Sequence, residues 1–244
     1  MSKRIELIDG LRGFAVCLMV LHHLMYDLVE FLGAPRWLFS CPPIDFLHVI
    51  FAGLFILLCG VSSNFSHSNL KRGLKTAAVA AGITLVTCLM DMDIIWGILH
   101  LLAFCMLLYG GAKWLEGKLP QRKKTLPGWA APTVYIVLLL ISVYLTGGRR
   151  ELADSPGGFI LWLLGLGNGP WRSSDYFPIL PWVFVFLFGT WLGGPIKDGR
   201  FPKWFYEAKM PVFSDIGRHS LIIYIVHQPV LFGIVMLIKL LAGI

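Results

Sequence analysis

Long apolar stretches separated by short polar connections make up most of this chain. Most of these stretches approach the ~20 residues that a helix needs to cross a bilayer, and they lie near 8–32, 44–65, 75–90, 94–112, 130–147, 177–196 and 216–240. A shorter apolar run over 159–166 lies between glycine- and proline-containing segments, and about eight residues are too few to cross as a helix. The pattern predicts an all-α polytopic membrane protein, with about seven transmembrane helices and one short re-entrant or interfacial helix, as a single domain over 1–244.

Composition indicates the same class. Hydrophobic residues are 57% and charged residues 14% of the chain, whereas soluble domains carry about 25% charged residues. The net charge is +7, but the Lys and Arg residues lie in short connections between apolar stretches, as the positive-inside rule expects. We therefore expect these basic side chains to face a lipid bilayer and not a nucleic acid.

The distribution of basic residues predicts the orientation. With the N-terminus in the cytosol, seven crossings place most Lys and Arg on the cytosolic side, including Lys71, Arg72 and Lys75. The basic residues left on the opposite side are Arg36, Arg149, Arg150, Arg172 and Lys239. This bias toward the cytosolic side holds only if 159–166 does not cross the membrane. We therefore expect seven crossings, with the N-terminus in the cytosol and the C-terminus on the opposite side.

Four ionisable residues interrupt the first apolar stretch: Asp9, Arg12, His23 and Asp27. Placing a charge at the bilayer centre costs at least ~2.5–3.5 kcal/mol, and the turn of about 100° per residue puts all four on one face of a helix. Asp27, one turn beyond His23, is expected to accept a ring N–H and leave the other nitrogen basic. The alternative is a structural set of ion pairs, Asp9 with Arg12 and His23 with Asp27.

The last apolar stretch holds a second polar group. Pro229 deprives a carbonyl near Ile225 of its helical partner, and His227 and Gln228 lie at that point, where polar groups line cavities in membrane proteins. A buried histidine bonded to another span is the alternative for His227. Arg218, at the cytosolic boundary, is either an anchor or part of the site.

Two further places carry candidate chemistry. Asp175 and Tyr176 precede a span that begins with two prolines three residues apart, Pro178 and Pro181, and could bind a hydroxyl or amine acceptor. The alternative is a helix cap beside an interfacial aromatic belt. His100 is a lone histidine, a type that is more often core than catalytic. Neither a CxxC nor an HExxH pattern occurs, so we expect no metal.

These motifs, in this order, resemble a known family. Ile8-Asp9-Gly10-Leu11-Arg12-Gly13 with an Arg-x10-His pattern completed at His23 resembles the first span of the transmembrane acyltransferase superfamily. The patches His23-x3-Asp27, Gly97 to His100, Asp175 to Trp182, and Gly217 to Pro229 resemble the bacterial branch of the heparan-α-glucosaminide N-acetyltransferase catalytic-domain family.

The resemblance implies transfer of an acyl group, usually acetyl from cytosolic acetyl-CoA, to an acceptor across a bacterial inner (plasma) membrane. It implies that His23, Asp27 and Arg12 are catalytic, and that the donor is bound by Arg12, Asp9, Lys71, Arg72 and Lys75. The acceptor, a carbohydrate or another small molecule, would contact His100, Asp175, Tyr176, Arg218, Tyr224, His227 and Gln228. His23 would act as base or as transient acyl carrier, and direct transfer is favoured because 34–44 contains no histidine.

Two other functions remain open at this point. A proton-coupled transporter or flippase would use the Asp/His stripe to relay protons, and a structural subunit would use it to hold spans together. Labelled acetyl on an acceptor would distinguish the enzyme from the transporter. A homo-oligomer is possible in each case.

Overall fold

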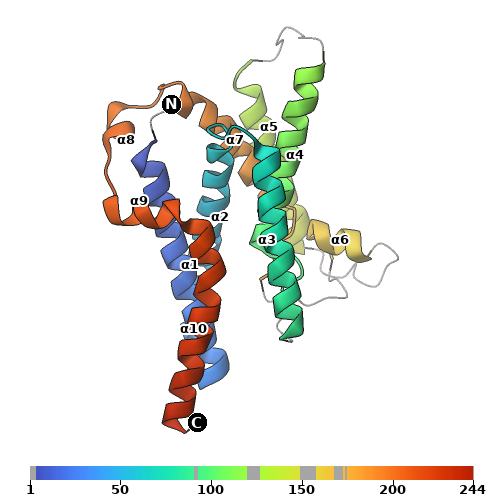
Figure 1. The fold of residues 1–244 in the computed structure, drawn as a ribbon. Coiled ribbons are helices and arrows are strands. Elements are labelled where there is room, and N and C mark those ends of the chain that lie inside the picture. The colour runs from blue at the N-terminus through green and yellow to red at the C-terminus, as the bar shows by residue number, and fades with distance from the viewer. Residues whose placement is uncertain are drawn as a thin grey trace. The chain divides into compact units, whose positions relative to one another are not determined.

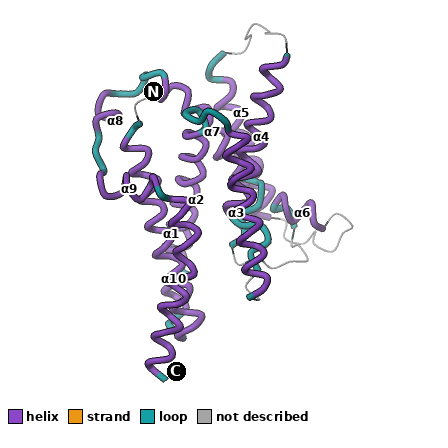
Figure 2. The backbone as a smooth tube through the Cα atoms, in the orientation of Figure 1, coloured by secondary structure: helices purple, strands orange, loops and turns teal. Residues whose placement is uncertain are grey.

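The computed structural model describes residues 4–90, 93–119, 127–148, 158–167, 173 and 175–243. Within these ranges every regular element is a helix and no strand occurs (Figure 2), which confirms the all-α prediction. The helices are α1 (Glu6–Leu32), η1 (Arg36–Leu38), α2 (Pro42–Ser62), α3 (Asn69–Leu89), α4 (Ile98–Lys118), α5 (Ala130–Gly148), α6 (Gly158–Leu164), α7 (Trp182–Lys197), α8 (Lys203–Glu207), α9 (Pro211–Arg218) and α10 (Ser220–Ala242) (Figure 1).

Six of the described helices are long and apolar enough to cross a membrane. The predicted span over 177–196 corresponds to α7, which has 16 residues and a length of about 24 Å, against a hydrocarbon core of about 30 Å. The run over 159–166 forms α6, a helix of 7 residues that is too short to cross. The protein is thus a polytopic helical membrane protein, and its described residues include six long apolar helices and the shorter apolar helix α7.

The helix α7 begins later than hydropathy predicts because two prolines precede it. The residue before a proline disfavours the α conformation, and Pro178 and Pro181 place this restriction on Phe177 and Leu180. The backbone of this segment bonds elsewhere: Phe177 N donates to Trp96 O at 3.1 Å, and Ile179 N donates to Leu163 O at 2.9 Å. The apolar run therefore enters the helix only at Trp182.

The helix α3 begins earlier than hydropathy predicts because its first turn is polar. Ser68 is the N-cap, and its hydroxyl oxygen accepts a hydrogen bond from Lys71 N at 3.2 Å. Such a cap satisfies one of the N–H groups that a helix start leaves without an intrahelical partner. Lys71, Arg72 and Lys75 consequently lie in the first two turns of α3 rather than in the connection before it.

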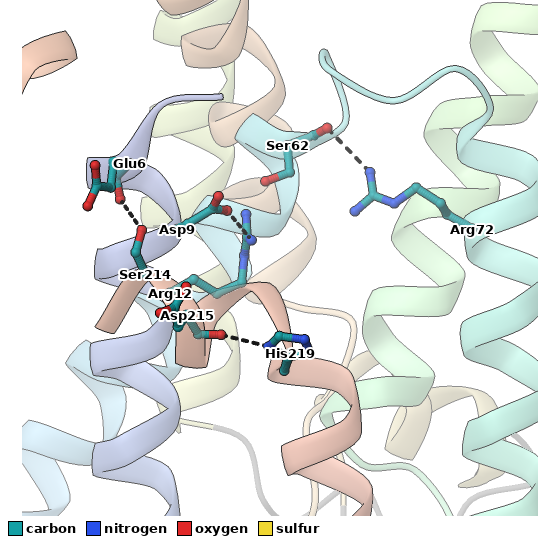
Figure 3. Close-up of polar contacts among 8 residues, drawn as sticks. All are labelled: Glu6, Asp9, Arg12, Ser62, Arg72, Ser214, Asp215 and His219. Atoms are coloured by element: carbon teal, nitrogen blue, oxygen red, sulfur yellow. Dashed lines mark hydrogen bonds and ion pairs between the residues drawn. The ribbon is translucent and has the colours of Figure 1, made fainter. Parts of the chain in front are cut away.

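The last predicted span, over 216–240, is divided in two. The helix α9 ends at Arg218, His219 has φ −102° and ψ 13°, and α10 starts at Ser220. The His219 ring Nδ1 donates to the Asp215 carbonyl oxygen at 2.9 Å (Figure 3). Pro229 lies inside α10, which continues through it to Ala242.

The chain forms two compact units, and the first joins its two ends: residues 1–58 and 201–244. Within it, α1 packs against α9 and α10. The contact with α9 is an approach of backbones, because a Cβ on Gly13 would collide with Phe213 O and a Cβ on Gly217 with Asp9 O. Ser214 Oγ also donates to Glu6 O at 3.1 Å (Figure 3). Two glycines thus bring α9 onto the N-terminal part of α1.

The second unit comprises residues 59–200. Within it, α3 packs on α4 and α5 on α7, around buried side chains that include Leu101, Cys105 and Phe186. Asn64 fixes the connection after α2, since its Nδ2 donates to Thr190 O at 2.6 Å. The basic residues at 122–124, Arg149, Arg150 and Arg172, and the flanks 154–157 and 168–170 of α6, lie outside the described residues. The predicted orientation stays a prediction.

Candidate functional site

A polar cluster connects α1 and α10 inside the first unit. His23 Nδ1 lies 2.8 Å from His227 Nε2, with ring centroids 4.9 Å apart. His227 is 8% exposed, and its Nδ1 lies 2.8 Å from Tyr224 O and 3.2 Å from Ile223 O. Two histidines from opposite ends of the sequence therefore form one hydrogen-bonded pair.

Asp27 and Gln228 form the second contact of this cluster. Gln228 Nε2 donates to Asp27 Oδ1 at 2.8 Å, and Asp27 is fully buried at 0% exposure. The expected hydrogen bond from a ring nitrogen of His23 to Asp27 is therefore wrong: Asp27 Oδ1 accepts from Gln228, and His23 Nδ1 lies against His227. The physical reason is that α10 offers partners to both residues of α1 at once.

Two buried oxygens of this pair have no hydrogen-bond partner among the described residues: Asp27 Oδ2 and Gln228 Oε1. A buried acceptor without a partner costs about 1–3 kcal/mol. Gln228 directly follows His227 in the sequence, and Asp27 lies one helical turn after His23 on α1. They are the strongest indication that this cluster receives hydrogen-bond donors from another molecule.

His22 lies on the other side of α1, as its position on the helix predicts. Its ring stacks on His48 of α2 with centroids 4.4 Å apart and an interplanar angle of 19°, and Phe39 and Phe51 also contact it. Both histidines are accounted for by packing.

Nearer the start of α1, Arg12 pairs with Asp9. Arg12 NH1 lies 2.9 Å from Asp9 Oδ1, and their side chains are 17% and 15% exposed (Figure 3). This ion pair is half of the structural set that the sequence left open. Arg12 is eleven residues from His23, a rise of about 16 Å along α1.

Arg218 and Tyr224, the other predicted acceptor contacts of this unit, occupy different environments. Arg218 is exposed, and its NH1 pairs with Asp215 Oδ1 at 2.8 Å. Tyr224 is buried, with its ring centroid 5.5 Å from that of His227. Tyr224 therefore belongs with the histidine pair, through both its ring and its carbonyl.

The remaining acceptor candidates, His100, Asp175 and Tyr176, lie together in the second unit. Asp175 Oδ2 accepts from Ile98 N at 3.2 Å, at the first residue of α4. Gly97 N donates to His100 Nδ1 at 3.2 Å, so the neutral ring carries its proton on Nε2, which faces Thr84 Oγ1 at 3.0 Å. Asp175 therefore bonds to the start of α4 and not to the span that follows it in the sequence, and His100 bonds to other groups of the protein.

Tyr176 follows the same pattern. Its hydroxyl donates to Trp162 O, and its ring stacks on Trp162. Burial raises the pKa of Tyr176 to about 12. The phenol therefore stays protonated and serves as a donor to the backbone at neutral pH.

The basic residues predicted to bind the donor lie at the start of α3. Arg72 NH1 donates to Ser62 O at 3.3 Å (Figure 3) and to Asn69 Oδ1 at 3.4 Å. Lys71 and Lys75 are exposed. A polar cavity of ≈ 430 Å³ opens beside this turn. Its lining includes Asn64, His67, Asn69, Tyr109, Lys113 and Trp114.

For His227 the sequence offered a buried histidine bonded to another span as the alternative to an acceptor contact, and the structure shows such a bond, to His23 of α1. The sequence did not identify His23 as that partner, and it did not assign Gln228 to Asp27. A usable signal existed, since ionisable and amide groups inside membrane spans pair with each other. The sequence does not give the rotation of α10 about its axis. That rotation places the consecutive residues His227 and Gln228 against His23 and Asp27, which lie one turn apart on α1.

Comparison with known proteins gives one match. A family model described as "Heparan-alpha-glucosaminide N-acetyltransferase, catalytic" matches residues 4–229. This range contains α1 and the part of α10 that holds His227 and Gln228. No curated protein and no solved structure matches the chain.

Proposed function

Since the chain belongs to the heparan-α-glucosaminide N-acetyltransferase catalytic family, which makes it a membrane acetyltransferase, we propose that it transfers the acetyl group of acetyl-CoA to a primary amine. The carrying observation is the buried cluster of α1 and α10: the His23–His227 pair beside Asp27 and Gln228. A histidine that can accept a proton next to buried acceptors is the minimum that such a transfer needs.

The bound ammonium first releases one proton to water, because a protonated nitrogen has no lone pair with which to attack. The neutral amine nitrogen then attacks the thioester carbonyl carbon and loses a second proton to His23. A C–N bond forms, the C–S bond breaks, and His23 returns the proton to the sulfur of the departing CoA. His23 is then neutral again, so the proposal requires neither a metal nor an acyl-histidine intermediate.

The unsatisfied oxygens favour an amine over a hydroxyl as acceptor. Asp27 Oδ2 and Gln228 Oε1 are two buried acceptors, and the His23 base is a third. A primary ammonium has three N–H donors for these three acceptors, whereas a hydroxyl has one. The carboxylate also favours a cationic group in a site of low dielectric constant. The amine is therefore proposed to be that of an amino sugar or another small amine.

The residues proposed to bind acetyl-CoA are chosen by their positive charge. In the first unit, Arg12, which pairs with Asp9, is proposed to bind the phosphates of CoA through its guanidinium. Lys71, Arg72 and Lys75, at the start of α3 in the second unit, remain predicted donor contacts. Asp175, Tyr176, His100 and Arg218 remain predicted acceptor contacts, although the bonds described above account for each of them. We propose a multi-pass location in a bacterial plasma membrane, with the donor on the cytosolic side.

Transfer of labelled acetyl tests this function. The protein in liposomes is incubated with acetyl-CoA that carries a labelled acetyl group and with glucosamine or its O-only analogue glucose. We expect labelled N-acetylglucosamine, no labelled glucose, and a loss of about 10²–10⁴-fold in His23→Ala; His219→Ala, an exposed control, should keep its rate. Full transfer by His23→Ala would remove His23 from the mechanism, and movement of unmodified solute with no acetylation would favour the transporter.

A further inference from the structure

His227 carries a further role that follows from which atoms face one another. Its Nδ1 lies 2.8 Å from Tyr224 O and 3.2 Å from Ile223 O. A backbone carbonyl can only accept a hydrogen bond. Nδ1 of His227 must therefore carry a hydrogen and donate it.

The neutral imidazole has one N–H and one lone pair, so the second nitrogen of His227 is fixed as well. Nε2 carries the lone pair and accepts. It lies 2.8 Å from His23 Nδ1, and a hydrogen bond at this distance needs one donor. Nδ1 of His23 is therefore the donor.

The donor role of Nδ1 also fixes the other ring nitrogen of His23. With its proton on Nδ1, neutral His23 has its lone pair on Nε2. The hydrogen bond that a histidine makes with one nitrogen decides which nitrogen is basic. The sequence suggested this task for Asp27, but Asp27 Oδ1 bonds to Gln228.

We propose that His227 is a positioning residue that sets the tautomer of His23, and that the Tyr224 carbonyl sets the tautomer of His227. The series Tyr224 O, His227, His23 keeps Nε2 of His23 unprotonated and oriented for the attacking nitrogen. This inference rests on the proposed function for its consequence in catalysis. The tautomer itself is a property of the protein without substrate.

A free histidine side chain prefers its proton on Nε2, the opposite of what the series imposes. Without His227, most His23 rings would carry the proton on the nitrogen that has to accept one. They would also lose the hydrogen bond that holds the ring plane. The rate of transfer should fall for this reason while donor binding is unchanged.

Nitrogen-15 NMR of ring-labelled histidine reads the tautomer without any activity. In the wild-type protein in nanodiscs, at a pH above the histidine titration, we expect the His23 signals, assigned by their loss in His23→Gln, to show a protonated Nδ1 and an unprotonated Nε2. In His227→Leu we expect the tautomer populations of His23 to shift toward the form with a protonated Nε2 and an unprotonated Nδ1. His227→Gln, whose amide oxygen can still accept from His23 Nδ1, should retain the wild-type tautomer.

Kinetics give the matching readout. His227→Leu should lower kcat by about 10²-fold, the lower end of the usual contribution of a general base, with KM for acetyl-CoA within about twofold, and His227→Gln should recover most of the loss. His219→Leu is the matched control: its Nδ1 also donates to a backbone carbonyl, but its ring lies outside the pair, so neither readout should move. Thermal unfolding of each variant separates loss of fold from loss of tautomer.

A protonated Nε2 on His23 in the wild-type protein would overturn the proposal. So would a His227→Leu variant that folds and keeps both its tautomer and its kcat. Absence of acetyl transfer in the wild-type protein would instead contradict the proposed function, and would leave the tautomer measurement standing.

Discussion

Single side chains in α1 have different tasks because their partners differ: α10 supplies the partner of Asp27, whereas Asp9 pairs with Arg12 of the same helix. Asp27 is fully buried and bonds to an amide, whereas Asp9 is in part exposed and pairs with a guanidinium. A buried carboxylate depends on its hydrogen bonds, while an exposed one is solvated. Substitutions of the two aspartates should therefore have different effects.

Replacing Asp27 separates charge from structure. Asp27→Asn keeps a carbonyl oxygen that accepts from Gln228, so we expect a free energy of unfolding within about 1 kcal/mol of wild type, together with a loss of acetyl transfer. Asp27→Leu leaves the Gln228 amide buried without its partner and should cost about 1–3 kcal/mol. Unfolding in detergent and a transfer assay measure both; wild-type transfer by Asp27→Asn would contradict a role for the carboxylate charge.

Arg12 offers a test of donor binding. Arg12→Lys keeps the charge but loses the planar fork, so KM for acetyl-CoA should rise about tenfold, which corresponds to about 1.4 kcal/mol, with kcat nearly unchanged. Arg200→Lys is the control, because its guanidinium lies in an exposed pair with Asp198 at 3.2 Å. An equal KM in Arg12→Lys and wild type would place the phosphates elsewhere.

At the scale of elements, hydropathy identified the long helices and missed their ends. Apolar runs mark α1, α2, α4, α5 and α10 because burial in lipid and burial in protein select the same residues. The start of α3 was missed because its first turn is stabilised by the Ser68 cap and not by apolar side chains. The short helices α8 and α9 were missed because they are held by contacts with α1 that no local pattern records.

The candidate site, like the helices, could be predicted only in part from the sequence. His23, Asp27, His227 and Gln228 could be selected as polar residues in apolar spans. Their partners could not, because pairing depends on which faces of α1 and α10 meet. The wrong assignment of Asp27 to His23 came from considering one helix by itself.

The contact of α1 and α9 depends on its glycines. Gly13→Ala and Gly217→Ala would each place a methyl group against a backbone carbonyl, and we expect a loss of about 1–3 kcal/mol or more, as in other overpacked sites. Gly233→Ala in α10 is the matched control: no atom lies within 4 Å of its Cβ position, and alanine favours a helix over glycine by up to about 1 kcal/mol. The midpoints of unfolding in detergent measure these changes. An equal fall in all three glycine variants would show that close packing of α1 on α9 is not the cause of the lost stability.

The cap of α3 gives a smaller, separate effect. Ser68→Ala should lower stability by about 0.5–2 kcal/mol, whereas Ser68→Asp keeps an oxygen that accepts from Lys71 N and should retain most of it. Thermal unfolding compares the two. Equal losses in both variants would mean that the hydroxyl acts otherwise than as a cap.

At the scale of the whole molecule, the length of α7 decides on which side the chain ends. Seven crossings place the N- and C-termini on opposite sides of the membrane, and six place them on the same side. The bias of basic residues predicts seven crossings with the N-terminus in the cytosol. Epitope tags at the two ends, probed by protease in sealed vesicles of known orientation, should show opposite protection; equal protection would mean that α7 does not cross.

The first unit is made from two segments that lie far apart in the chain, and this has a consequence for biosynthesis. His23 of α1 and His227 of α10 are 204 residues apart, so their pair cannot form before the ribosome has made α10. A nascent chain that contains α1 but not α10 holds His23 without the partner that we propose to orient it. We therefore expect chains that stop before α10 to be inactive.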